Sequence, residues 1–266
     1  MKNKLNLVEQ KMAINCSKEF GRIKKFLGNQ LHKANLKKAI VAISGGVDSS
    51  VAAAICCRVL GVQNVIVLKL PYKGISSSGS EEDADKLINF LKLPKKNILN
   101  FDINSVVNNY KKQLRPSPLR LGNIMARARM IYVYDTAKKY KGLVMGTCNR
   151  SELLLGYETR YGDGACDINF LASLYKNQIY QLAQFYKLPK SILEKEPSAE
   201  LWPGQTDQGE LGFTYTWVDP LLYLMFDKKL SRNKLFKVYG YKKTDIQKIV
   251  DMVENNKFKQ LLPPTC

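Results

Sequence analysis

Histidine is almost absent from this chain, which has a single histidine, His32, among 266 residues. A zinc site with the usual histidine spacing and a Ser-His-Asp triad are both disfavoured by so little imidazole. Cysteine pairs with the Cys-x-x-Cys spacing are missing too, although the chain has six cysteines. We expect these to be reduced thiols, and Cys56 and Cys57 to pack inside a helix. What remains is chemistry by metals, positioning and fixed charges.

Long apolar runs are also missing. The N-terminus reads MKNK without the apolar stretch of a signal peptide, and no later run is long enough to cross a membrane. We therefore expect a cytoplasmic protein with no membrane partner. The length suits one large α/β domain with a full core. We predict a single domain over 1–266, with an N-terminal helix in 1–35 and a helical tail in 215–266.

Acidic residues are outnumbered, at 23 against 42 lysines and arginines, for a net charge of +19. Such an excess can mark a nucleic-acid-binding protein. The lysines are scattered, however, in short pairs such as Lys37-Lys38 and Lys242-Lys243, with no long basic tract that includes aromatic residues. We interpret the excess as a solvated lysine-rich surface and expect no nucleic-acid partner.

The stretch 41–50, VAISGGVDSS, predicts a phosphate site. The apolar run 39–43 indicates a buried strand, and the small-residue run 51–60, headed by Asp and Ser, indicates a helix. A strand, a two-glycine turn and a helix N-terminus bind anions because the first helical amides have no internal partner and the helix dipole is positive there. We therefore expect residues 44–50 to hold phosphate.

The loop has neither the lysine of the Walker A pattern nor the three spaced glycines of the dinucleotide fingerprint. An aspartate inside a phosphate loop would repel its ligand unless a divalent cation lay between them. Asp48 therefore indicates magnesium. An ordinary glycine-rich turn with a capping aspartate is the alternative interpretation.

The alternation of expected strands and helices predicts the fold. After an amphipathic helix over 5–32, strands are expected in 39–43, 62–70, 97–103 and 142–147, with helices between and after them. This pattern is typical of an α/β fold: a doubly wound parallel sheet of about five strands, helices on both faces and a helical C-terminal tail. Residues 71–80 and 197–212 are candidate mobile loops, with a plain linker as the alternative for the first.

Arg127 stands out in the helix expected over 121–140. It follows Ile124 by three residues and precedes Ile131 by four, which places it on the apolar stripe. A buried guanidinium is costly unless it is paired. We expect either a buried ion pair or a contact with a carboxylate or phosphate of a ligand.

Several segments together have the order seen in one known family. They are SGGVDSS (44–50), GNIMARARM (122–130), Gly146-Thr147 with Glu152, YGDG (161–164), DIN (167–169) and KEPSAEL (195–201). From about Lys38 to Pro264 the chain resembles the ammonia-dependent NAD synthetases, which belong to the N-type ATP pyrophosphatases. Their glutamine-dependent relatives carry an additional amide-hydrolysing domain, for which this chain has no room.

The resemblance implies a ligase that forms a C–N bond. The nicotinate carboxylate of deamido-NAD would attack the α-phosphorus of ATP, and ammonia would then displace AMP from the adenylated intermediate to give NAD. Neither step requires a catalytic nucleophile from the protein. The resemblance also implies Mg²⁺ and a homodimer. The alternative is a tRNA-modifying ATP pyrophosphatase or another amidating synthetase with the same loop.

The resemblance also implies roles for individual residues. ATP would be bound by Ser44, Gly45, Gly46, Val47, Asp48, Ser49, Ser50, Thr147, Lys176 and Ser198. Deamido-NAD would be bound by Arg127, Arg160, Asp167 and Lys259, and the metal by Asp48 and Glu152. Three residues depart from the family's commoner pattern: Arg160 for lysine, Ser198 for threonine, and Phe258 for a histidine whose polar contact is lost.

Overall fold

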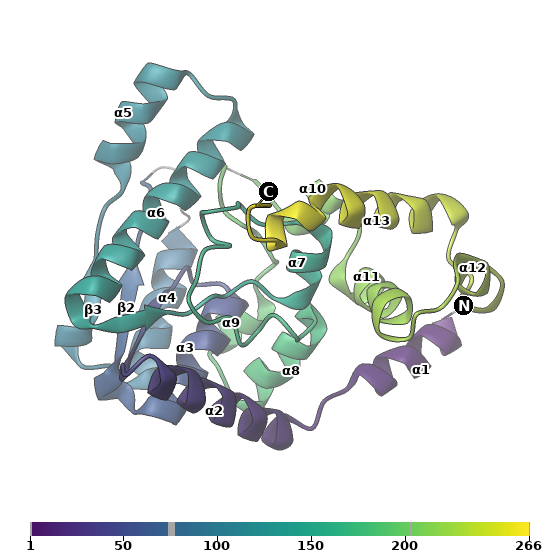
Figure 1. Cartoon of the computed structure of the whole chain (residues 1–266), viewed down its shortest axis with the longest axis horizontal. Helices are drawn as coiled ribbons and strands as arrows, with labels where there is room; N and C mark the ends of the chain where they lie inside the picture. Colours follow the sequence, from purple (N-terminus) through teal and green to yellow (C-terminus); the bar gives the residue numbers. More distant parts are fainter. Residues whose placement is uncertain (1, 74–77, 203, 266) are drawn as a thin grey trace.

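A parallel β-sheet forms the centre of the computed structural model, which describes residues 2–73, 78–202 and 204–265 (Figure 1). The strands are β1 (Lys38–Ala42), β2 (Val65–Lys69), β3 (Ile98–Asn100) and β4 (Gly142–Val144), in the order β3-β2-β1-β4. Ile40 of β1 pairs with Ile66 of β2. Within these residues the sheet has four strands instead of about five, and an isolated bridge between Met145 and Ile168 continues its edge.

Helices cover both faces of the sheet, as predicted. They are α2 (Cys16–Lys33), α3 (Val47–Leu60), α4 (Ser78–Leu91), α5 (Asn104–Leu114), α6 (Pro118–Tyr140), α7 (Arg150–Leu155), α8 (Lys176–Phe185) and α9 (Lys190–Glu194), with short 3₁₀ turns η1 (Val62–Asn64) and η2 (Lys95–Asn97). Ala39 and Val41 pack in one core with α2, α3 and α8. Ile40 faces the other core, with α5 and α6. Because both faces are covered, β1 is apolar at successive positions.

The N-terminal segment is two helices, so the prediction of one helix over 5–32 was wrong. α1 (Lys2–Met12) and α2 are separated at residues 13–15. Asn15 caps α2, because its side chain accepts a hydrogen bond from the amide of Lys18 at 2.9 Å. Val8 and Met12 of α1 are buried against the C-terminal helices, whereas α2 packs on α3 and α8.

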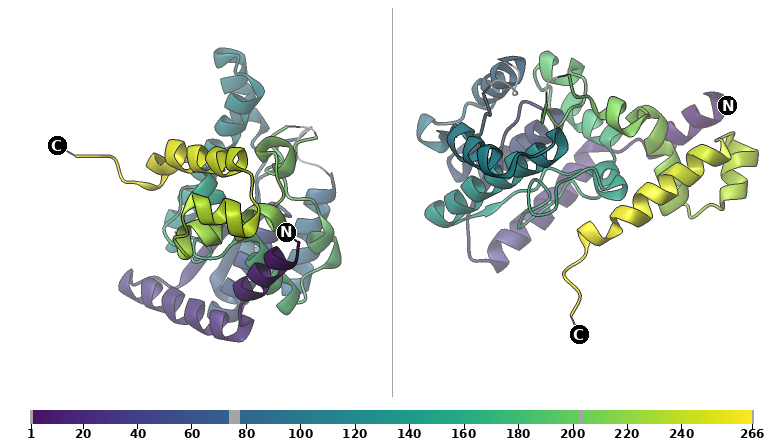
Figure 2. Two further views of the ribbon diagram at one scale, coloured as in Figure 1. Left: turned by 90° about the vertical axis from the view of Figure 1, so that its right-hand side faces the viewer. Right: turned by 90° about the horizontal axis from the view of Figure 1, so that it is seen from above.

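The C-terminal part is helical, as predicted, and has its own core. Its elements are α10 (Asp207–Leu211), α11 (Tyr215–Leu222), the π-helical turn η3 (Tyr223–Asp227), α12 (Arg232–Tyr239), α13 (Lys243–Asn256) and the 3₁₀ turn η4 (Lys257–Gln260). Val218, Leu235 and Ile249 are fully buried within this core. Figure 1 shows α11–α13 beside the sheet layers, and Figure 2 shows the C-terminal segment after η4 extending away from the body.

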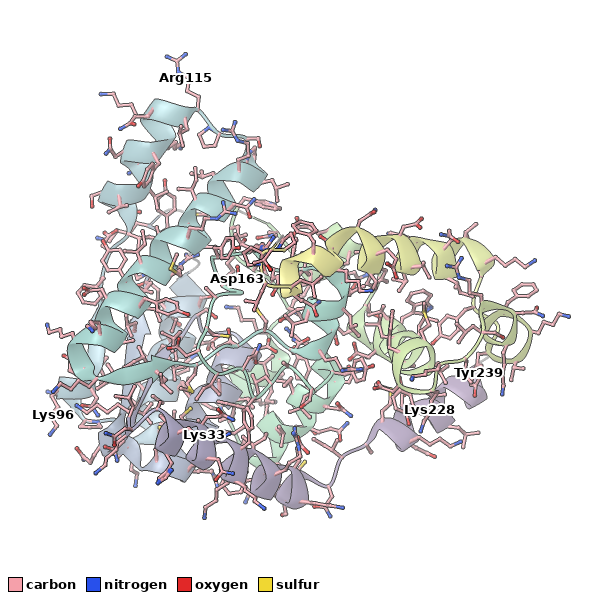
Figure 3. The ribbon with its side chains drawn as sticks, viewed as in Figure 1. Lys33, Lys96, Arg115, Asp163, Lys228 and Tyr239 are labelled. Atoms are coloured by element: carbon pink, nitrogen blue, oxygen red, sulfur yellow. The ribbon has the colours of Figure 1, made fainter. Side chains whose placement is uncertain are left out.

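No helix in the described part of the chain is long and apolar enough to cross a membrane. Exposed charged side chains lie at several separate places, including Lys33, Lys96, Arg115 and Lys228, and Asp163 is seen between α6 and α7 (Figure 3). Cys56 and Cys57 are buried in α3, which confirms the prediction that they are packing residues. Burial raises the pKa of both thiols, that of Cys57 to about 12.

Candidate active site

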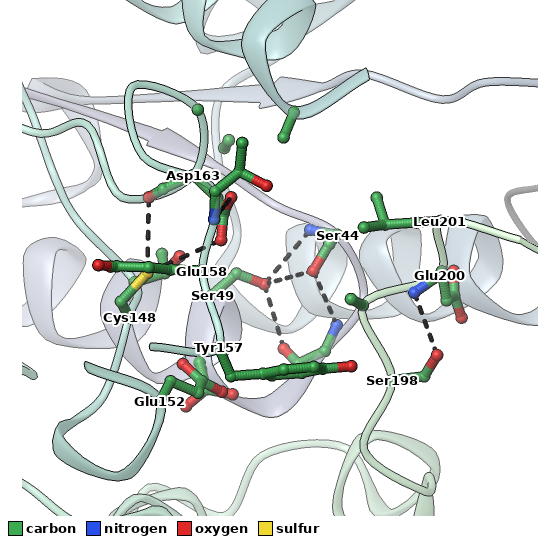
Figure 4. Close-up of a pocket in the computed structure, with 18 of the residues that line it drawn as sticks. Ser44, Ser49, Cys148, Glu152, Tyr157, Glu158, Asp163, Ser198, Glu200 and Leu201 are labelled. Atoms are coloured by element: carbon green, nitrogen blue, oxygen red, sulfur yellow. Dashed lines mark hydrogen bonds between the residues drawn. The ribbon is translucent and has the colours of Figure 1, made fainter. Parts of the chain in front are cut away.

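A cavity of about 640 Å³ opens at the carboxyl ends of β1, β2 and β4. This is the edge where ligands bind in open parallel sheets. Ten of the predicted site residues line it: Ser44, Gly46, Val47, Asp48, Ser49, Thr147, Glu152, Lys176, Ser198 and Lys259. Figure 4 shows Ser44 and Ser49 on one side of this cavity, facing Cys148, Glu158 and Asp163. One cavity therefore contains most of the residues proposed for ATP.

The phosphate loop is fixed by its own backbone and hydroxyl groups. Gly45 has φ +83°, and a Cβ there would lie 2.3 Å from the carbonyl oxygen of Ser80, so only glycine fits. The hydroxyls of Ser44 and Ser49 lie 3.2 Å apart, and that of Ser50 donates to the Gly46 carbonyl at 2.7 Å. These contacts hold the loop open towards the cavity.

The helix after this loop begins earlier than predicted. It starts at Val47, with Gly46 as the N-cap and no side-chain cap, instead of after Asp48-Ser49-Ser50. Glycine is acceptable as an N-cap, and its place here leaves Asp48 in the first helical turn. The amides of this turn are therefore directed at the cavity end of α3, as an anion site requires.

Asp48 and Glu152 come together, as the prediction of a shared metal site requires. Lys176 lies between them: its ammonium is 2.6 Å from Asp48 Oδ2 and 2.9 Å from Glu152 Oε1. Asn149 holds the other two oxygens, with its side-chain amide 2.8 Å from Asp48 Oδ1 and its backbone amide 3.1 Å from Glu152 Oε2. Asn149 was missed as a site residue. Its signal was the capping-box pattern Asn149-x-x-Glu152 at the start of α7.

Burial and charge act in opposite directions on this cluster. Burial alone would lower the pKa of the Lys176 ammonium, but Asp48 and Glu152 outweigh it and raise the pKa well above its usual value. Burial raises the pKa of Glu152, and the ammonium only partly offsets that increase. The charge of Lys176 therefore favours the ionised form of Glu152, whereas burial favours its neutral form.

Two more buried carboxylates lie near this site, and neither was predicted from the sequence. Asp207 is buried, and its Oδ2 accepts a hydrogen bond from Tyr215 at 2.9 Å, while its Oδ1 has no partner. Asp219 is fully buried and accepts from the Ser151 hydroxyl at 2.6 Å and the Asn177 amide at 2.9 Å. Burial raises the pKa of Asp219 to about 7. Its signal was a carboxylate inside the apolar run 217–222.

This surplus of carboxylates suits a divalent cation. Asp48 and Glu152 contact one ammonium, Asp207 and Asp219 are buried nearby, and one oxygen of Asp207 has no hydrogen-bond partner. Across the described residues, no three carboxylate, thiol or imidazole groups form a complete metal site. Magnesium is usually held by one or two carboxylates together with phosphate oxygens and water, so two carboxylates beside a phosphate loop fit it.

The arginine on the buried face of α6 is Arg129, not Arg127. Arg127 is exposed, and its Nε and one terminal nitrogen donate to the Arg160 carbonyl at 3.3 Å. The expected apolar stripe faces outward, since Ile131 is 55% exposed. Arg129 lines the cavity and donates to the Leu70 carbonyl at 3.0 Å. The helix faces its core through Met125 and Ala128, and this choice of face could not be read from spacing alone.

The other residues proposed for deamido-NAD lie around the loop 156–167. Lys259 donates to the carbonyls of Gly156 at 2.6 Å and Glu158 at 3.1 Å, and burial lowers its pKa. Asp167 is exposed but accepts the Val144 amide at 2.7 Å. Lys259 lines the cavity, but Arg127, Arg160 and Asp167 do not.

Arg160 ties the C-terminal tail to this loop. It donates to the Leu261 carbonyl at 3.0 Å, and its guanidinium lies 5.5 Å from the ring of Phe258 and 4.9 Å from that of Tyr161. Phe258 therefore replaces the lost polar contact with a cation–π contact to Arg160. Arg160 and Phe258, two of the three departures from the family pattern, therefore lie next to each other.

The two candidate loops differ in how much the structure describes. Residues 74–77 of the first lie outside the described residues, and α4 begins at Ser78, within the expected loop 71–80. The second contains α10 and is held by Ser198, whose hydroxyl donates to the Gln205 carbonyl at 2.7 Å. Lys195, just before this loop, pairs with Glu200 inside the loop at 2.8 Å. Both side chains contact the Ser80 hydroxyl. Their mobility stays a prediction.

Acidic side chains form the wall opposite the phosphate loop, and the sequence analysis assigned them no role. Asp163 accepts the Thr159 amide at 2.9 Å, and the Cys148 thiol lies 3.5 Å from the Asp163 carbonyl oxygen. Glu158 lines the same wall, and burial raises its pKa (Figure 4). This wall carries carboxyl groups, in contrast to the amide-lined phosphate loop.

A parallel sheet, a glycine phosphate loop at its carboxyl edge and facing carboxylates define a nucleotide-binding α/β protein. Comparison with known sequences identifies it further. The chain belongs to the NAD synthase family, whose sequence model matches residues 19–263. The resemblance drawn from the motifs is thereby confirmed.

Individual relatives agree with this assignment. The chain is 41% identical over 243 residues to the NH₃-dependent NAD⁺ synthetase of Wolinella succinogenes, covering 90% of this chain and 91% of the relative. The NH₃-dependent NAD synthetase structure from Campylobacter jejuni has a TM-score of 0.80 at 30% identity, over 95% of this chain and 100% of that chain. The NMN synthetase structure from Francisella tularensis has a TM-score of 0.83 at 29% identity, over 95% of this chain and 99% of that chain.

Proposed function

We propose that this protein is an ammonia-dependent NAD synthetase that amidates deamido-NAD at the expense of ATP. The main support is the match to the NAD synthase family over residues 19–263. The cavity agrees with it, because the phosphate loop lines it together with Asp48, Glu152 and Lys176. The nicotinate carboxylate attacks the α-phosphorus, which forms a carboxyl–AMP ester and releases pyrophosphate. Ammonia then attacks the ester carbonyl, and AMP leaves with the carboxylate oxygen.

The protein's part in both steps is to bind and align the reactants. Residues 44–50 bind the ATP phosphates through backbone amides and hydroxyls, with Thr147 and Ser198 further along the cavity. Lys176 supplies the positive charge that a Walker lysine supplies elsewhere. Alignment of two bound reactants can contribute about 7–11 kcal/mol to catalysis without a protein nucleophile.

Asp48 and Glu152 hold magnesium in this proposal. When bound, the metal neutralises charge on the leaving pyrophosphate. The two carboxylates are positioned for it by Asn149, which fixes one oxygen of each. Glu158 and Asp163 give the opposite wall a negative charge that suits an ammonium ion before it loses its proton.

Arg127, Arg160, Asp167 and Lys259 bind deamido-NAD in this proposal. Only Lys259 reaches the cavity within one copy of the chain. Arg127 shares its exposed helix face with Leu119 and Ile131, which are 59% and 55% exposed. A homodimer that covers this face would bring the exposed arginine next to the bound dinucleotide. We place the protein in the cytoplasm, where its small-molecule substrates are made and used.

Nicotinate mononucleotide is the main alternative to deamido-NAD as the acid substrate. The likeness to the Francisella NMN synthetase, at a TM-score of 0.83, favours testing nicotinate mononucleotide beside deamido-NAD, because both present the same carboxylate. Transfer of AMP to tRNA has no such support.

Product analysis tests the proposal. The purified protein is incubated with ATP, magnesium, ammonium and either deamido-NAD, nicotinate mononucleotide or tRNA. We expect NAD, AMP and pyrophosphate in equal amounts from deamido-NAD. ADP as the nucleotide product, or no NAD, would reject the proposal, and faster amidation of the mononucleotide would reassign the substrate.

A further inference from the structure

Lys176 occupies the position between the two carboxylates proposed for the metal. Its side chain is almost completely buried, with the residue 3% exposed. The ammonium contacts Asp48 at 2.6 Å and Glu152 at 2.9 Å, and it also lies 5.0 Å from the centre of the Tyr215 ring. Lys176 is therefore a buried component of this site and not a surface side chain.

All four oxygens of Asp48 and Glu152 already accept a hydrogen bond. Lys176 supplies two of the donors, and Asn149 supplies the other two. The Asn149 donors are fixed, because one is a backbone amide and the residue caps α7. The ammonium is the one donor at the end of a long side chain. A cation that binds both carboxylates must therefore displace Lys176 or lie next to its charge.

We propose that Lys176 keeps divalent cations out of the site until ATP binds, so that metal and nucleotide enter together. The inference rests on the proposed function, since it takes Asp48 and Glu152 as the metal ligands. ATP makes the exchange possible because its phosphates offer the ammonium new oxygen partners in the same cavity that Ser44, residues 46–49 and Lys176 line. The unpartnered Oδ1 of Asp207, a buried residue that lines the same cavity, is a further acceptor.

The protein's ligand set favours this order of binding. Two carboxylates are too few to hold magnesium without phosphate oxygens or several waters. An ammonium that competes for the same oxygens weakens binding of the bare metal further. With ATP present, the phosphates supply metal ligands and also attract the lysine away from the carboxylates.

Metal binding without nucleotide tests the inference directly. Free Mn²⁺ is measured by electron paramagnetic resonance as it is titrated into the wild-type protein, Lys176→Met and Lys176→Arg, with no ATP. We expect Lys176→Met to bind Mn²⁺ at least about tenfold more tightly than the wild type, and Lys176→Arg, which keeps the charge, to bind as weakly as the wild type. Mn²⁺ affinity in Lys176→Met equal to or below that of the wild type would overturn the inference.

A matched control separates this effect from the loss of any buried lysine. Lys69 pairs with Asp85 at 2.6 Å and is also mostly buried, but it does not contact Asp48 or Glu152. Lys69→Met should leave Mn²⁺ affinity unchanged, and an equal gain in this variant would count against a specific role for Lys176. Should Lys176→Met fold poorly, the wild type decides: Mn²⁺ alone should leave its melting temperature unchanged, and a rise of several degrees would reject the inference.

The outcome is independent of the reaction assay. A wild-type protein that forms NAD, with no gain in Mn²⁺ affinity in Lys176→Met, would reject only the inference. A protein that forms no NAD, while Lys176→Met gains affinity, would reject the proposed function and leave the lysine's control of the metal site intact.

Discussion

The two ends of the candidate site are built very differently. At the phosphate end, β1, α3, α7 and α8 converge, and Asp48, Glu152 and Lys176 hold each other through contacts of 2.6–2.9 Å. At the other end, Arg127 and Arg160 are held by backbone carbonyls of a loop and of the C-terminal tail. At the phosphate end the side chains hold one another and Lys176 is buried, whereas Arg127 at the other end is exposed.

In the proposed function the two ends bind different substrates: the phosphate end binds ATP, and the other end binds the acid. The phosphate end has rigid secondary structure behind each side chain, as precise alignment of ATP requires. The far end consists of a loop and the C-terminal tail, and in the proposed function it binds the acid. Variants at the two ends should therefore change different steps, and the following predictions test that separation from the largest effect to the smallest.

Asp48→Asn should have the largest effect. The amide keeps the shape of the side chain but cannot neutralise Lys176 or bind a divalent cation well. We expect pyrophosphate release to fall by at least about 10²–10³-fold, as measured in a deamido-NAD-dependent assay. Asp85→Asn, at an exposed carboxylate paired with Lys69, is the control and should retain wild-type activity. Near-normal activity of Asp48→Asn would remove its role at the metal.

Arg127→Ala should affect only the far end. We expect the KM for deamido-NAD to rise about tenfold or more, equivalent to about 1.4 kcal/mol, and the KM for ATP to stay within about twofold. Sedimentation of the same variant would report whether the exposed face of α6 also carries the dimer contact. Arg22→Ala, an exposed arginine on α2 that pairs with Glu19, is the control. Equal losses for both substrates would make Arg127 structural.

Gly45→Ala should affect only the phosphate end. Its φ of +83° and the carbonyl of Ser80 at 2.3 Å from the added Cβ predict a loss of about 1–3 kcal/mol in the free energy of unfolding and a raised KM for ATP. Gly28→Ala, with nothing within 4 Å of its Cβ in α2, should gain up to about 1 kcal/mol. Urea denaturation measures both. An unchanged KM for ATP in Gly45→Ala would break the link between loop shape and nucleotide binding.

Asp219→Asn should change the pH dependence of stability. Folding raises the pKa of Asp219 from 3.8 to about 7, so the folded protein binds more protons than the unfolded chain between these values. Its contribution to stability is therefore fully present below about pH 4 and is lost as the pH rises towards 7, by at most about 1.4 kcal/mol per pH unit. The variant should lack this component. Identical pH profiles of the two proteins would show that folding does not shift the pKa of Asp219.

The sequence was informative where a local pattern determines the structure. Strand, glycine turn and helix at 38–60 predicted the phosphate loop, and the spacing of strands and helices predicted the layers of the fold. The family resemblance assigned Asp48, Glu152 and Lys176 to one site. In the structure the Lys176 ammonium lies within hydrogen-bond distance of both carboxylates. Local patterns could not tell that Lys176 would lie between the carboxylates, because Lys176 is 128 positions from Asp48 and 24 from Glu152.

Other errors also arose from tertiary packing. The stripe through Arg127 had helical spacing, but which face of α6 is buried depends on the sheet and on α5. The break between α1 and α2 depends on Asn15, a cap inside an otherwise continuous helical pattern. Asp207 and Asp219 entered the site from the C-terminal helices, whose position no local signal gives.

Transfer of an oxygen atom tests the central claim most directly. Deamido-NAD labelled with ¹⁸O in its nicotinate carboxylate is converted in the presence of ATP, magnesium and ammonium, and the AMP is analysed by mass spectrometry. An adenylated carboxylate predicts one ¹⁸O atom in each AMP molecule, because the carboxylate oxygen leaves with the phosphate. AMP without the label, or ADP in its place, would contradict the account.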